Sequence, residues 1–280
     1  MIPATIASPD RLVLTAPMAL RFRDPWGQQV AWSRFRVVAR HPLRPGKEWS
    51  LVPGPSGGFL LHDLPAVLSA NYPSVGDDLP PATTTRDSRW MVRVQDPLGQ
   101  FLPMDFAVTV PTAGFVRISK DPTDPALEGT GLGMFPSSMR PYPASWAVVR
   151  ANLVSASDLQ PLAWARMVVY QGSTALGAGL SNASGEVLAS FPCPPPPPVP
   201  LDPHEAASYD PKAWTCTARV FHDVALQESE IPPQSVIAGS PEVQPLESLA
   251  PDTPMGPWTL RAGVTRILST HSKSSLHVAA

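Results

Sequence analysis

Side chains able to do chemistry are few in this sequence and lie far apart. Two histidines are each followed by an aspartate, in His62-Asp63 and His222-Asp223, a pairing that resembles the metal-binding dyad of hydrolases. Such an enzyme needs further histidine and acidic ligands that converge on one site. The pattern predicts no metal site, because the other histidines show no HxH or HxxxH spacing. These are His41, His204, His271 and His277.

The sequence gives no indication of a phosphate site or a catalytic thiol. The run Gly129-Thr130-Gly131-Leu132-Gly133 lacks the lysine and the following helix of a phosphate-binding loop, so we expect a flexible loop. Cys193 lies among prolines without a spaced histidine, which argues against a catalytic thiol. Asn182-Ala183-Ser184 fits the glycosylation acceptor pattern, but we expect an ordinary turn before Gly185. We therefore predict no enzyme activity, no catalytic residues and no cofactor.

Proline dominates the composition and indicates the fold class. The chain has 37 prolines in 280 residues, about 13% against roughly 5% in average globular proteins. Proline breaks helices but is accepted at strand ends, sheet edges and turns, so we expect an all-β protein with long connections. Apolar residues (43%) and charged residues (16%) are in the proportions of a folded chain, and the length allows two cores.

Charge and hydropathy exclude several classes of partner. Lysine and arginine number 21 against 23 acidic residues, a formal net charge of −2, so the chain has no basic field for nucleic acid. No run approaches the roughly 18 apolar residues of a membrane span, and residues 1–6 lack the pattern of a signal peptide. We expect a soluble, cytoplasmic protein without membrane insertion. Cys193 and Cys216 are expected to be reduced thiols, with a bridge between them as the alternative.

An internal repeat predicts the domain organisation. Residues 30–38 (VAWSRFRVV) match residues 162–170 (LAWARMVVY) at a constant offset of 132, and residues 56–61 match residues 184–189 at an offset of 128. Short strands with turn signals between them, such as the hairpin expected at Asp96-Pro97-Leu98-Gly99-Gln100, are typical of a β-sandwich. The predicted units are a first sandwich domain over 1–118, a linker or ordered crossing loop over 119–143, and a second sandwich domain over 144–280 that carries a polyproline segment and a C-terminal arm.

Tryptophans and prolines supply the candidate protein contacts. Trp26 lies in a tight turn and is expected to be exposed. The polyproline II rod is expected to lie over the domain surface, with an SH3-type ligand as the alternative. Trp258 follows a second proline-rich connection, residues 231–257, which we predict to be a rigid arm that docks on a neighbouring subunit. The rod comprises Pro194, Pro195, Pro196, Pro197 and Pro198.

The two tryptophans of the internal repeat are expected to be structural. Trp32 and Trp164 occupy identical repeat positions beside apolar neighbours, which favours a place in the core. A weaker match, with different spacing, sets Trp90 against Trp214.

One pattern resembles the carboxypeptidase-regulatory-like, or transthyretin-like, β-sandwich repeat. It consists of LRFRD at 20–24, GQQV at 27–30, a strand and a loop, then SGGFLL at 56–61 and Asp63-Leu64-Pro65. The family has a D-x-x-G-x-P-V opening and a T-D-x-x-G-x-F turn; here Pro55-Ser56 stands before the glycine in place of the Thr-Asp, and the second copy at 181–187 is closer. The resemblance covers about half of the chain and implies two tandem Ig-like or transthyretin-like sandwiches. Most members of the family are non-catalytic accessory or structural modules.

The tandem arrangement is similar to accessory proteins of phage-tail-like contractile injection systems. The similarity lies in Ala163-Trp164-Ala165-Arg166, the proline connection and a terminal Leu-Arg-Ala-Gly strand. It implies a non-enzymatic structural or adaptor subunit whose partners are other protein subunits, with association between copies of this chain left open. The subunit would assemble in the cytoplasm into a particle that lysis can release. The alternative is a stand-alone module that binds carbohydrate or a cell surface through Trp26, Trp90 and Tyr72.

Overall fold

The described part of the chain is almost entirely β-structure, which confirms the all-β expectation. Its other elements are a short 3-10 helix, η3 (Val224–Leu226), and one turn and a half of α-helix, α3 (Gln234–Gly239). No helix in this part is long and apolar enough to span a membrane. The computed structural model describes residues 19–20, 22–23, 34–42, 44–54, 58–60, 89–109, 132–195, 210–231, 233–249 and 252–279.

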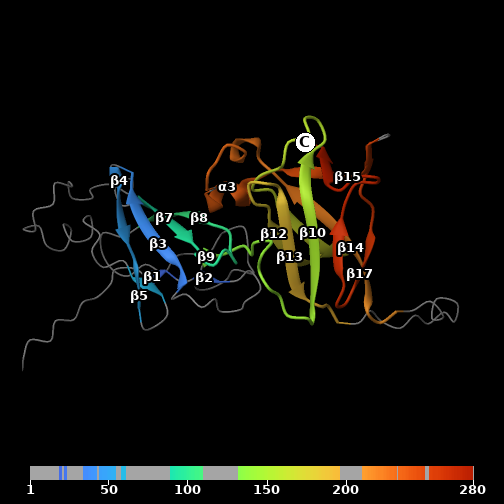
Figure 1. The fold of residues 1–280 in the computed structure, drawn as a ribbon, viewed down its shortest axis with the longest axis horizontal. Coiled ribbons are helices and arrows are strands. Elements are labelled where there is room, and N and C mark those ends of the chain that lie inside the picture. Colours follow the sequence, from blue (N-terminus) through green and yellow to red (C-terminus); the bar gives the residue numbers. More distant parts are fainter. Residues whose placement is uncertain are drawn as a thin grey trace, which may run out of the picture.

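The N-terminal part contains a four-stranded antiparallel sheet with the order β4-β3-β7-β8 (Figure 1). Alternate residues of its strands point to one buried face, as the period of two in a strand requires. On the central strands this face carries Val37, Ala39, Trp90, Val92 and Val94. The strands are β3 (Arg36–His41), β4 (Arg44–Ser50), β7 (Arg89–Gln95) and β8 (Met104–Thr109).

The hairpin that the sequence predicts between β7 and β8 is confirmed. The Asp96 carboxylate accepts hydrogen bonds from the backbone N–H groups of Leu98, Gln100 and Phe101. Gly99 takes a φ of +65°, a conformation that glycine adopts without strain. Arg34 donates to the same carboxylate at 3.2 Å, so the turn also holds the segment that leads into β3.

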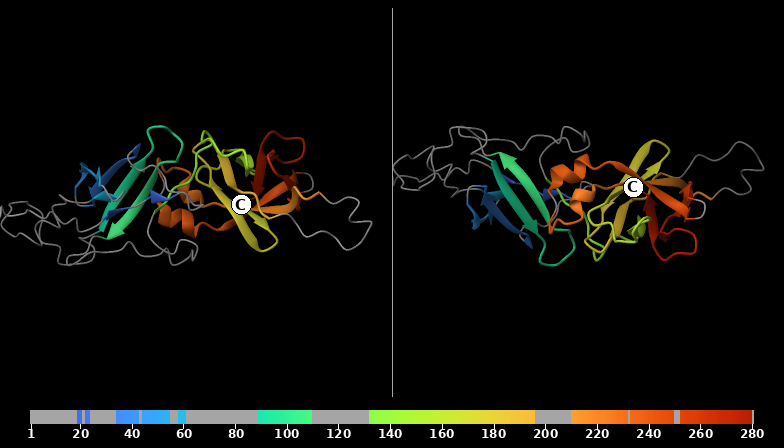
Figure 2. Two further views of the ribbon diagram at one scale, coloured as in Figure 1. Left: turned by 90° about the horizontal axis from the view of Figure 1, so that it is seen from below. Right: turned by 90° about the horizontal axis from the view of Figure 1, so that it is seen from above.

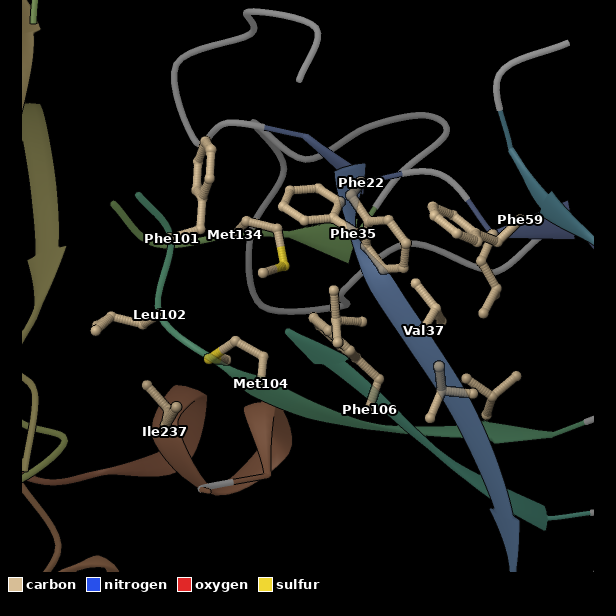
Figure 3. Packing of buried hydrophobic residues seen from close by; sticks show 14 of the residues in the cluster. Phe22, Phe35, Val37, Phe59, Phe101, Leu102, Met104, Phe106, Met134 and Ile237 are labelled. Atoms are coloured by element: carbon tan, nitrogen blue, oxygen red, sulfur yellow. The ribbon is translucent and has the colours of Figure 1, made fainter. Parts of the chain in front are cut away.

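Short strands cover the buried face of this sheet. Figure 3 shows aromatic rings from these strands, including Phe22 and Phe59, packed with Phe35 and Phe106. Met134, fully buried, follows β9 and joins the same cluster. The first part of the predicted linker or crossing loop, residues 119–131, lies outside the described residues. The short strands are β1 (Ala19–Leu20), β5 (Val52–Pro53) and β6 (Phe59–Leu60), which form one sheet, and the parallel pair β2 (Phe22–Arg23) and β9 (Leu132–Gly133).

The C-terminal part is one large sheet that folds over on itself. Its main path is β12-β11-β14-β15-β19-β10-β13, and side chains from both halves of this path form a single buried cluster. The two end strands approach so closely that a Cβ added to Gly179 would overlap the Leu188 carbonyl oxygen. The strands are β10 (Trp146–Ser155), β11 (Arg166–Gln171), β12 (Thr174–Leu180), β13 (Glu186–Pro192), β14 (Ala213–Phe221), β15 (Glu242–Leu249), β16 (Asp252–Pro254), β17 (Trp258–Arg261), β18 (Thr265–Leu268) and β19 (Leu276–Ala279).

The repeated segments occupy corresponding places in the two sheets. In each copy the repeated strand, β3 or β11, pairs with the strand that follows it and with a later strand, β7 or β14. Trp90 and Trp214 are each the second residue of that later strand, and both are buried. Trp164 is buried as expected, whereas Trp32 lies outside the described residues. The weaker sequence match at Trp90 therefore agrees with the strand order.

The predicted C-terminal arm is corrected by the structure. Most of residues 231–257 fold back into the protein, as α3, β15 and β16. Residues 224–231 and 233–240, here called the crossing segment, leave β14 and lie against the N-terminal sheet (Figure 2). Pro233 forms a parallel bridge to Asp105 at the outer edge of β8, and Leu226 and Ile237 enter the N-terminal buried cluster (Figure 3). Burial of these side chains explains why the segment does not extend into solvent.

Hydrogen bonds fix the crossing segment to the turn before β11. The Gln227 amide accepts from the Ala163 N–H at 3.1 Å and donates to the Pro161 carbonyl oxygen. The indole N–H of Trp164 donates to the Ser229 carbonyl oxygen at 2.9 Å. Trp164 also packs in the N-terminal cluster, so one side chain links the C-terminal sheet, the crossing segment and the N-terminal core.

Substitution of Ile237 should destabilise the N-terminal sheet, although this residue belongs to the C-terminal half of the chain. Ile237→Ala removes a buried side chain and leaves a cavity, at an expected cost of about 2 to 4 kcal/mol in the free energy of unfolding. Val224→Ala is the matched control, since Val224 is 72% exposed and should cost under about 0.5 kcal/mol. Urea unfolding measures both effects, and hydrogen exchange should become faster in β7 and β8 for Ile237→Ala alone. Unchanged exchange there would contradict the packing.

Candidate functional site

The described start of the proline rod is attached to the C-terminal sheet. Pro194 is half-buried and Pro195 is exposed, and the Pro195 carbonyl oxygen accepts a hydrogen bond from the indole N–H of Trp214 at 2.8 Å. This contact agrees with a connection laid along the domain surface. The other candidate contacts before β14 lie outside the described residues; they are Trp26, Pro196, Pro197 and Pro198.

Two tryptophans proposed as contact residues are buried. Trp258 is 8% exposed, because alternation along β17 points Trp258 and Leu260 into the C-terminal cluster. Trp90 has no exposed surface and packs against Trp49 and His41, so it offers no platform for a sugar. The assignments of Trp258 as a protein contact and of Trp90 as a sugar contact are both corrected, because each ring is buried in a core cluster. Tyr72, the third aromatic of the carbohydrate alternative, lies outside the described residues.

The His222-Asp223 pair has a structural role. The Asp223 carboxylate caps η3 by accepting from the Ala225 N–H at 2.9 Å. His222 is buried, and burial lowers its pKa, which favours the neutral ring. Among the described residues no group of three His, Cys, Asp or Glu side chains is placed to hold a metal ion. The other pair, His62-Asp63, lies outside the described residues.

Both cysteines are free thiols in the structure. Cys216 lies in the C-terminal core, and burial raises its pKa to about 11. Burial also raises the pKa of the half-buried Cys193, against a smaller opposite effect of a backbone hydrogen bond at Gly263. A thiol with a raised pKa is a poor nucleophile at neutral pH, so neither cysteine is activated.

The described surface has a groove that the sequence did not lead us to expect. It lies between β17 and β18 and is open to solvent. Two apolar side chains of this region are exposed, Val264 at 56% and Ile267 at 65%. The signal in the sequence is the pair Arg261 and Arg266 among apolar residues after Trp258. The groove is lined by Thr259, Arg261, Val264, Thr265, Arg266 and Ile267.

Comparisons with known proteins assign no family. No family model and no curated protein matches the chain. Among solved structures, a 9R-lipoxygenase from Cyanothece PCC8801 is similar at 13% identity and a TM-score of 0.23, over 48% of this chain and 17% of that one. The Bacillus anthracis TIE protein matches at 9% identity and a TM-score of 0.25, over 94% of this chain and 33% of that one. The shaft pilin SpaA of Lactobacillus rhamnosus GG matches at 8% identity and a TM-score of 0.20, over 94% and 96%.

These likenesses are too weak to carry an argument about fold or function. The chain also spans only 17% and 33% of the lengths of the lipoxygenase and the TIE protein.

Thiol labelling should separate the two cysteines. Without reductant, the denatured chain is expected to react with two equivalents of a thiol reagent. In the native protein at pH 8, Cys216 should react far more slowly, because it is buried and its pKa is about 11. Cys193→Ser is the control, since it should remove the faster native reaction and leave the slow one. A denatured chain with no reactive thiol would show that the two cysteines are bridged.

Stability should fall as the pH is lowered through the range in which unfolded histidine takes up a proton. The pKa of His222 is lowered in the fold, so the unfolded chain binds the proton first as the pH falls below about 6.5, and folding then loses stability. The pKa of His277 is lowered as well, mainly by burial, so it adds to the same trend. His222→Gln should flatten the pH dependence of the unfolding midpoint, whereas exchange of the exposed His271 for Gln should not. Equal slopes in all three proteins would contradict the assignment.

Proposed function

We propose that the chain is a non-enzymatic structural or adaptor subunit of a multi-protein assembly. The observation that supports this is the crossing segment, through which residues from the C-terminal half complete the N-terminal core. An adaptor has to hold two surfaces in a fixed relation, and packed side chains such as Ile237 and Trp164 do this better than a flexible linker. Burial and hydrogen bonds in this region thus hold the two sheets in a fixed relation to each other.

We further propose that the two sheets belong to two tandem β-sandwiches of the transthyretin-like kind, with domains over residues 1–118 and 144–280. The matching partners of β3 and β11 support a duplicated unit. The turn at 181–187, where the resemblance to this family is closer, is well formed. The Asn182 side chain accepts from the Ser184 and Glu186 N–H groups, and Gly185 takes a φ of +79°.

The assembly we propose is a phage-tail-like contractile injection particle. The basis is the sequence resemblance described above. The partners would then be other protein subunits, copies of this chain among them. A formal net charge of −2 disfavours nucleic acid as a partner.

The carbohydrate-binding alternative has less support from the described residues. It depended on three exposed aromatic rings, and one of them, Trp90, is completely buried. An exposed aromatic platform is what such a module needs for stacking on a sugar. Trp49 and His41 pack against the Trp90 ring, so this ring is not available for stacking on a sugar.

Sedimentation of the tagged chain from its native host tests the subunit proposal. The tagged chain is expected in the fast-sedimenting particle fraction, with the same partner proteins recovered at fixed ratios. The same tag on an unrelated soluble protein controls for trapping in that fraction. A monomer in every fraction, with no partner, would contradict the proposal. A monomer that binds on a glycan array would instead support the carbohydrate-binding alternative.

A further inference from the structure

The two halves of the C-terminal sheet are joined to each other by strand pairing at one end, between β15 and β19, and are not joined at the other end, between β17 and β18. Alternate residues of a strand direct their backbone N–H and C=O groups to the same edge. On β14, the His222 N–H donates to Pro241 next to β15, and the Lys212 carbonyl accepts from Ala262 next to β17. Residues 212 and 222 are an even number apart, so β15 and β17 lie along the same edge of β14.

The facing strand β10 is arranged in the same way. Residues 148–151 of β10 pair with β13 on one edge and with β18 on the other. Further along β10, Val154 forms a bridge to Pro161 on the same edge of β10 that pairs with β13. β19 pairs with residues 153–155 of β10 and therefore lies on the opposite edge, beside β18. β15 and β19 pair with each other and close the gap between the two halves of the sheet. Within the described residues β17 and β18 do not pair with each other. The groove between them is therefore bordered by strand edges that pair with no described strand.

The charged side chains that line this groove are two arginines, Arg261 and Arg266, beside the apolar Val264 and Ile267. The Arg261 guanidinium is 3.7 Å from the Asp210 carboxylate, and the Arg266 guanidinium lies 6.0 Å from the centre of the Trp258 ring. Ile267 adds an apolar side chain that is 65% exposed, on a strand whose outer edge pairs with no described strand.

From this geometry we infer that the groove accepts an extended acidic and apolar segment of another protein subunit, which adds as a strand beside β18. An open sheet edge binds an extended peptide through main-chain hydrogen bonds, and alternate side chains of the peptide then determine specificity. Here carboxylates would face Arg261 and Arg266, and an apolar side chain would cover Ile267. The inference rests on the proposed function, since it assigns a partner chemistry to this subunit.

Charge complementarity selects this occupant over a second copy of the chain. If the edge paired with the same edge of another copy, Arg261 and Arg266 of both copies would be brought together. Like charges placed opposite each other in an interface cost several kcal/mol. An acidic segment instead adds attraction to the main-chain pairing.

Peptide binding to the full chain tests strand addition directly. The probe is a labelled peptide of alternating glutamate and valine, and binding is measured by fluorescence anisotropy. Two matched peptides carry lysine in place of glutamate, or N-methyl groups on alternate residues of the glutamate peptide. Only the unmodified glutamate peptide is expected to bind, because the N-methyl groups remove the hydrogen bonds of one strand edge. Equal binding of the N-methylated peptide would show non-specific charge attraction and overturn strand addition.

Charge reversal at the groove provides a second test of the inference. The double variant Arg261→Glu, Arg266→Glu should bind the glutamate peptide at least about tenfold more weakly and should gain affinity for the lysine peptide. This gain distinguishes a changed groove from a misfolded protein. Arg36→Glu on the N-terminal sheet is the matched control, with an exposed arginine far from the groove in sequence, and should bind as the natural chain does. Unchanged affinity in the double variant would overturn the proposed site.

Sedimentation of the same variants separates this inference from the subunit proposal. If the chain enters a particle and the double variant enters it equally well, the groove is not the docking site, although the subunit proposal stands. If the natural chain binds the glutamate peptide but is found in no assembly, the subunit proposal fails and the peptide site stands. Loss of assembly in the double variant, but not in Arg36→Glu, would support both.

Discussion

The relation between the two sheets depends on the packing of the crossing segment against β8. A sheet edge presents unpaired backbone groups, and proteins cover or blunt such edges to avoid unwanted pairing. Here the Pro233 bridge to Asp105 covers the outer edge of β8. Proline has no N–H to donate, so this contact supplies less hydrogen bonding than a full strand would. The stabilisation therefore comes mainly from burial of Leu226 and Ile237, at roughly 1.5 to 3 kcal/mol for each side chain.

The chain treats the edges of its two sheets differently. The edge of β8 is covered by a segment of the same chain, and Asp105 there is also held by a two-bond ion pair with Arg93. The edge between β17 and β18 has no such cover among the described residues. The crossing segment buries Leu226 and Ile237 beside the β8 edge, so this edge is covered from within the chain. The open edge, with Ile267 exposed beside two arginines, is chemically suited to a strand from outside.

Local signals in the sequence predicted local structure well. The proline content indicated the all-β class, and the Asp96-Pro97-Leu98-Gly99 turn and the Asn182 turn both have the side-chain hydrogen bonds that their residue types favour. The crossing segment could not be predicted in the same way. Its prolines suggested an extended arm, and nothing near Ile237 in the sequence shows that its partners are Leu102 and Met104, more than a hundred residues earlier. Tertiary packing decided the conformation of this segment.

The open groove follows from a competition between strand partners. β17 and β18 are separated by a short turn with Gly263 at a φ of +72°, a spacing that favours a hairpin. Instead, β17 pairs four residues with β14, and β18 pairs four residues with β10. Each of these partners is long and already anchored in the core, so adding to them buries Trp258, Leu260 and Leu268. A hairpin would give up this burial, so β17 and β18 splay apart, and no described strand pairs with their outer edges.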